Sequence, residues 1–190
     1  DISLLELLAR TTEINANGAM GRNQKGYFHV RFQLGLSAPV AISLLRENTK
    51  DLSLGIKAIE YAFQHQNSDG SFQAVIPLNL LAEGIPSEAD KASGVAFFYH
   101  DLGRALLLMK ESDWFLSSGE TAPLRARIEK LRPRIQESLS KLMTQAPDLE
   151  KLDYRDTNRL FFDAGAYYLV GSWLGDQKAI ELGIDFLKKA

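Results

Sequence analysis

Cysteine is absent from the 190 residues, which excludes a disulfide framework, thiol catalysis and cysteine-based zinc sites. No apolar run approaches the roughly 20 residues that a membrane-spanning helix needs. Strand signals are nearly lacking, because apolar and polar residues rarely alternate. A strong excess of one charge is also missing: the net charge is −2, and basic residues are spread among acids. We therefore expect neither a membrane nor a nucleic acid among the partners.

What the chain does contain is helical periodicity. Apolar residues recur every three or four positions, and short polar turns separate these stretches. The composition, 45% hydrophobic and 24% charged, is that of an ordinary globular protein, and the length predicts a single domain over 1–190. The pattern predicts an all-α fold with helices over residues 2–12, 32–46, 52–66, 87–109, 121–143, 158–174 and 178–190.

Two kinds of helix alternate along the chain. Residues 32–46 and 158–174 are apolar almost all round and predict buried helices, whereas residues 52–66 carry a single apolar stripe and predict a surface helix. Placing residues 31–62 over 159–190, at an offset of 128, aligns buried helix, turn and surface helix without gaps. Arg31 then matches Arg159, and Gly55 matches Gly183. We interpret this as a repeat of helical hairpins, with residues 87–143 forming a third hairpin between them.

Two segments carry a family resemblance. Residues 66–72, Gln-Asn-Ser-Asp-Gly-Ser-Phe, resemble the Gln-x-x-Asp-Gly-Ser-aromatic turn of many (α/α) toroid proteins. Residues 158–176 resemble an inner helix of toroid polysaccharide lyases of the alginate-lyase kind. The resemblance implies an (α/α) toroid, or an incomplete toroid of about three helical hairpins whose ring is completed by residues outside this sequence. The Asn-His pair typical of those lyases is not found, and Tyr99-His100 is the nearest substitute.

The function that this resemblance implies is a carbohydrate-active enzyme, a polysaccharide lyase that cleaves a uronate-containing glycan by β-elimination. Arginine holds a carboxylate through two hydrogen bonds, and a tyrosine or histidine moves the protons. An oligo- or polysaccharide is the expected partner, and we expect no metal or cofactor. The resemblance places catalysis at Tyr99, His100 and Arg159, and substrate binding at Tyr27, His29, Arg31, Arg104, Tyr154 and Asn158.

Other interpretations stay open at this point. A toroid glycoside hydrolase needs two carboxylic acids across a cleft, and Asp101, Asp156 and Asp163 are available, although no pair stands out. A non-catalytic toroid that binds glycan or protein is a further alternative. Each histidine and arginine also has a purely structural interpretation in a helical core. The first residue, Asp1, favours a processed periplasmic or secreted protein or a fragment, and a cytoplasmic location is the alternative.

Overall fold

The computed structural model describes residues 2–75, 87–154 and 156–190. Within these ranges the regular structure is helical, and the only β-type pairing consists of isolated bridges. None of the helices in the described ranges has the length and hydropathy to cross a membrane. The α-helices are α1 (Ile2–Thr11), α2 (Ser37–Leu45), α3 (Thr49–Gln64), α4 (Glu88–Glu111), α5 (Asp113–Ser117), α6 (Ala122–Thr144), α7 (Ala146–Asp153), α8 (Thr157–Leu174) and α9 (Gln177–Lys189).

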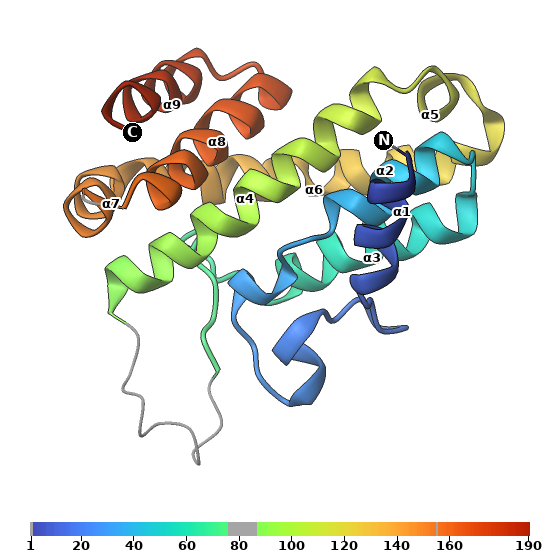
Figure 1. The fold of residues 1–190 in the computed structure, drawn as a ribbon, viewed down its shortest axis with the longest axis horizontal. Helices are drawn as coiled ribbons and strands as arrows, with labels where there is room; N and C mark the ends of the chain where they lie inside the picture. Colours follow the sequence, from blue (N-terminus) through green and yellow to red (C-terminus); the bar gives the residue numbers. More distant parts are fainter. Residues whose placement is uncertain (1, 76–86, 155) are drawn as a thin grey trace.

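Three antiparallel hairpins organise these helices: α2 with α3, α4 with α6, and α8 with α9 (Figure 1). α4 lies in the middle and packs against α2 on one side and α8 on the other. α2, α4 and α8 run in the same direction, while α3, α6 and α9 return (Figure 1). We call α2, α4 and α8 the inner helices, and α3, α6 and α9 the outer helices. The N-terminal ends of the inner helices consequently lie at one end of the molecule, together with the loops that precede them.

The hydrophobic core explains why α4 is the central element. Most of its residues from Ala92 to Met109 are buried, because neighbouring helices cover it on several sides. Its start is fixed by a capping box, in which Ser87 accepts a hydrogen bond from the Asp90 amide and the Asp90 carboxylate accepts one from the Ser87 amide.

The hairpin repeat at an offset of 128 has a structural counterpart. Asn48 caps α3 and Asp176 caps α9, each accepting a hydrogen bond from the amide three residues later, at 3.1 and 3.2 Å. Gly55 and Gly183 both lie where an outer helix meets its inner partner. A Cβ on Gly183 would come within 2.7 Å of the Tyr168 backbone nitrogen. The two hairpins therefore share both their turn and their closest helix approach.

A second repeat joins two turns, residues 14–20 and 66–72, at an offset of 52. In each turn the second residue's amide donates to the sixth residue's carbonyl, at 3.0 and 2.8 Å, and the first and last residues form an isolated bridge. The fifth residue is Gly18 or Gly70, with φ of +96° and +83°. A Cβ there would collide with the carbonyl oxygen of Lys57 in α3 or of Glu137 in α6. Each turn thus rests on the outer helix of the hairpin that follows it.

The structure corrects the sequence prediction in three places. The helix predicted over 32–46 begins only at Ser37, after a 3-10 turn at Val30–Gln33 and after Gly35, whose φ is +96°. The sequence pattern also left residues 113–117 and 146–153 outside any helix, and they form α5 and α7. The remaining predicted helices are found with their ends shifted by a few residues.

Candidate functional site at the inner-helix ends

Charged and aromatic residues from three separate segments meet at the N-terminal ends of the inner helices. His29 and Arg31 come from the loop before α2, Asp90 and Lys91 from the first turn of α4, and Arg159 from the first turn of α8. The pKa of Asp90 is lowered, mainly by the hydrogen bond from the Ser87 side chain, and also by the positive charge of Arg159 and by the nearby His29. Asp90 is therefore under the influence of residues on both neighbouring segments.

His29 is held in place by the buried side chain of Asn23. The Asn23 Nδ2 donates to the His29 carbonyl at 3.1 Å, and the Asn23 Oδ1 accepts from the His29 amide at 2.9 Å. The imidazole packs directly on α4, since a Cβ on Gly94 would collide with the ring. Its Nδ1 accepts a hydrogen bond from the Arg31 amide at 3.2 Å, so a neutral ring carries its proton on Nε2.

The His29 imidazole is predominantly neutral near pH 7. Its pKa is lowered from 6.5, first because burial disfavours the charged ring and second because the Arg31 guanidinium is close. Asp90 opposes this shift and Lys91 adds to it. A neutral imidazole beside a cation can take up and release a proton during a reaction.

Arg31 begins a row of stacked side chains across the inner helices. Its guanidinium lies over the Phe97 ring, 4.4 Å from the ring centre. Phe97 of α4 stacks on Phe162 of α8 at 4.2 Å, and His100 lies 4.8 Å from Phe162. We call Arg31, Phe97, Phe162 and His100 the inner row. It links the loop before α2 to the second turn of α8, and Arg104 follows His100 one helical turn later.

Arg31 and Arg104 both lie along the inner row. Among the described residues, neither Arg31 nor Arg104 forms an ion pair, and both are exposed. The pKa of His100 is lowered, first by burial and then by the charge of Arg104. The surface along the inner row is therefore cationic, with aromatic rings beneath it, and is suited to acidic groups on a flat ligand.

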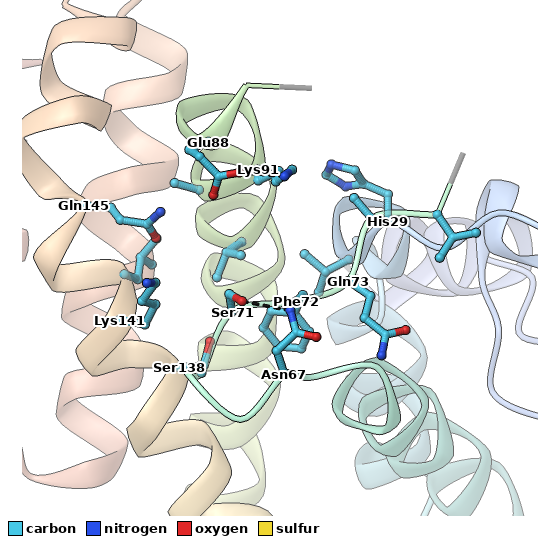
Figure 2. A pocket seen from close by; sticks show the side chains of 17 residues that line it. His29, Asn67, Ser71, Phe72, Gln73, Glu88, Lys91, Ser138, Lys141 and Gln145 are labelled. Atoms are coloured by element: carbon cyan, nitrogen blue, oxygen red, sulfur yellow. Dashed lines mark hydrogen bonds and ion pairs between the residues drawn. The ribbon is translucent and has the colours of Figure 1, made fainter. Parts of the chain in front are cut away.

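A pocket of about 480 Å³ lies beside His29 and extends toward the outer helix α6 (Figure 2). Such a volume falls within the roughly 300–1,000 Å³ of small-molecule sites. Three segments form its walls: the loop at residues 67–75, the first two turns of α4, and the last part of α6. The polar side chains that line it are His29, Asn67, Ser71, Gln73, Glu88, Lys91, Ser138, Lys141 and Gln145.

Arg159 lies at the same end of the molecule but is already paired. Its Nη1 lies 3.1 Å from Asp153 Oδ1, and its Nε lies 3.3 Å from Asp156 Oδ2. Behind it, the fully buried Asp163 faces Asp153. Burial, and then the neighbouring Asp153 carboxyl group, raise the pKa of Asp163 from 3.8 to about 8, so that it is protonated at neutral pH. The Arg159 guanidinium is therefore already paired with the carboxylates of Asp153 and Asp156 and is less available to a ligand.

No family model, curated protein or solved structure matches the chain. In the part of the chain that the structure describes, no group of three or more histidine or acidic side chains is placed to hold a metal ion. The site is therefore interpreted from its own residues.

The other residues predicted for the site are distributed as follows. Tyr99 is completely buried, and its hydroxyl donates to the Ile135 carbonyl at 3.0 Å, which gives it a structural role in joining α4 to α6. Tyr27 packs edge-on against Phe32, 6.1 Å between ring centres. Tyr154, 71% exposed, and the exposed Asn158 lie at the two sides of the connection between α7 and α8.

The carboxylates considered for hydrolysis are poorly placed for it. Asp101 is buried and accepts hydrogen bonds from the Ser37 amide and hydroxyl. Asp163 is buried against Asp153, and Asp156 caps α8. Hydrolysis requires two carboxyl groups that face each other across an accessible cleft. The geometry does not favour this alternative.

Sequence reasoning missed Phe97, Phe162 and Asp90 as members of the site. The sequence holds only part of the signal for the two rings. Phe97 in α4 and Phe162 in α8 each follow a charged or polar helix start by about two turns. One apolar residue in each of two buried helices does not reveal that the two rings will stack on each other, because this contact depends on how the helices pack. The polar segment at residues 66–72 was interpreted as a turn alone.

Proposed function

We propose that the chain is part of an (α/α) toroid that binds a uronate-containing glycan at the inner-helix ends and cleaves it by β-elimination. The observation that carries this proposal is the exposed guanidinium of Arg31 over Phe97, next to the imidazole of His29. These are two groups that the reaction needs: a cation for the carboxylate and a group that transfers a proton. The half-buried Phe162, which stacks on Phe97, adds apolar surface beside them.

The toroid part of the proposal is supported by repetition. Inner helices run in one direction and outer helices return, as in a ring of hairpins. The turns at residues 14–20 and 66–72 each follow a surface helix, α1 or α3, and lead toward an inner helix. On this view, α1 is the outer helix of a preceding hairpin. Its exposed Leu4, Leu7 and Leu8 form the face that a further hairpin would cover.

In the proposed reaction, the Arg31 guanidinium neutralises the uronate carboxylate and stabilises the enolate that forms when the C5 proton leaves. The imidazole of His29 takes that proton, and the C5–H electrons form a double bond between C4 and C5. The bond from C4 to the glycosidic oxygen breaks, and this oxygen receives a proton from the imidazolium. No water is consumed. Acting as the base through Nε2 requires the tautomer with Nδ1 protonated, which is reached when the ring gives up the 3.2 Å contact with the Arg31 amide.

The test is to incubate the 190-residue chain with uronate polymers and record the ultraviolet absorbance of the unsaturated product. His29→Gln should lower the rate by about 100-fold or more, because general acid–base catalysis supplies factors of that size, while glycan binding is retained. Arg31→Gln should weaken both binding and turnover. Arg10→Gln, an exposed arginine on α1, is the matched control. New reducing ends without the absorbance would show hydrolysis and contradict the proposal.

A further inference from the structure

We infer that the pocket beside His29 is a subsite for an uncharged sugar unit, so that the substrate is a heteroglycan in which a neutral sugar neighbours the uronate. This inference rests on the proposed function and adds the class of substrate. It follows from a difference between the two sides of His29: the inner row presents exposed arginines that form no ion pair with any described residue, whereas the lysines of the pocket are paired with carboxylates.

The charges of the pocket are paired within the protein. Lys91 lies 2.6 Å from Glu88, and Lys141 lies 3.1 Å from Asp69. An acidic group entering the pocket would have to compete with these carboxylates for each lysine. It would also stand close to two negative charges. The pocket therefore favours a ligand without net charge.

The remaining lining matches the two faces of a sugar ring. Phe72, Val95 and Leu142 supply apolar surface, on which the C–H face of a pyranose can pack. Gln73 and Gln145 lie on opposite walls (Figure 2), and within the described residues neither side-chain amide has a hydrogen-bond partner. Each amide both donates and accepts, as hydroxyl groups require. This combination is typical of sites that bind neutral polar ligands.

His29 lies at the junction of the two surfaces. It lines the pocket, and through its Nδ1 it contacts the residue that begins the inner row. A glycan that crosses this junction would place its uronate at Arg31 and the adjoining sugar in the pocket. The bond between them would then pass beside the imidazole. A glycan made only of uronates would instead place a carboxylate in the pocket, where the lysines are already paired with Glu88 and Asp69.

The experiment compares kcat/KM on a uronate homopolymer, polygalacturonate or polymannuronate, with that on hyaluronan, in which glucuronate alternates with N-acetylglucosamine. We expect the alternating polymer to be preferred by about 10-fold or more. Ala74→Trp, which places a large ring in the pocket from its half-buried lining position, should lower kcat/KM on hyaluronan more than on the homopolymer and so abolish this preference. Ser68→Trp, at an exposed position of the same loop outside the pocket, should retain the preference.

Equal rates on both polymers in the unmodified chain, or an equal loss on both in Ala74→Trp, would overturn the inference. The proposed function fails in a different way, through the absence of unsaturated product from every polymer. In that case calorimetric titration with neutral disaccharides, cellobiose, lactose and chitobiose, decides the inference by itself. Binding that Ala74→Trp removes and Ser68→Trp retains would support a neutral-sugar site, and binding of none of the three would overturn it.

Discussion

Replacing Asp163 with asparagine should make the protein more stable at neutral pH, although it removes a buried carboxyl group. Asp163 and Asp153 are both completely buried and face each other. When both are ionised, neither oxygen of Asp163 has a donor among the described residues. Arg159 lies 3.1 Å from Asp153 and compensates one negative charge. Folding therefore requires Asp163 to hold a proton, which an unfolded chain releases far more readily.

The size of the effect follows from the pKa of Asp163, which rises from 3.8 to about 8 on folding. Between these values the folded protein binds a proton that the unfolded chain has lost, so stability falls as the pH increases. The stabilisation that comes from the proton on Asp163 is fully present below pH 4 and is lost as the pH rises toward 8. Each pH unit in this window costs about 1.4 kcal/mol, which amounts to about 4 kcal/mol at neutral pH. Asparagine is uncharged, and its amide can donate to Asp153.

The assay is urea unfolding of the unmodified chain and of Asp163→Asn at a series of pH values from 4 to 9. We expect a small difference in the free energy of unfolding at the acidic end, a growing advantage of the variant with pH, and a plateau above about pH 8. Taking the difference between the two proteins removes the contributions of all other titrating groups. An advantage that does not change with pH, or a variant less stable at pH 7, would refute a shared proton at this pair.

Three further predictions test the packing. Tyr99→Phe should cost about 1–2 kcal/mol in chemical denaturation and leave the elimination rate unchanged, because its hydroxyl bonds only inside the core. Gln33→Leu should cost about 3–5 kcal/mol in the same assay, since Gln33 is fully buried and takes part in four hydrogen bonds to the loop before α2 and to α3. Gly183→Ala should lower the melting temperature, because the added Cβ would clash with the α8 backbone. Gly119→Ala is the control, since a Cβ at Gly119 would lie in open space. Equal effects of the two substitutions would contradict the close approach of α8 and α9.

Much of the fold could be predicted from the sequence, because helical periodicity and capping residues are local signals. Ser87 and Asp156 are residue types that favour the first position of a helix, and both cap the helices that follow them. The start of α2 could not be predicted in this way. Residues 30–36 have an apolar pattern that favours helix, but Gln33 binds the carbonyl groups of Gly18 and Ala58 instead, and Gly35 adopts a positive φ. Contacts distant in sequence decide the conformation there.

For the same reason, local signals could place the residues of the candidate site only in part. His29 and Arg31 precede the apolar stretch of residues 32–46 in the sequence, and they lie in the loop before α2. Tyr99 and His100 are adjacent in sequence, yet a helix turns neighbouring side chains about 100° apart. His100 therefore contacts Phe162, whereas Tyr99 lies inside the core. The match of residues 14–20 with 66–72 was missed because glycine and one asparagine are the identities that the two turns share.

The 52-residue spacing of these turns bears on how such a chain can change in length. Each turn has the same internal hydrogen bonds and the same glycine seated on an outer helix. Genetic recombination between the two copies would delete or duplicate a whole inner and outer helix pair, and every junction would still fall inside an intact turn. Chains with different numbers of hairpins are thus accessible in single steps, without passing through a broken helix.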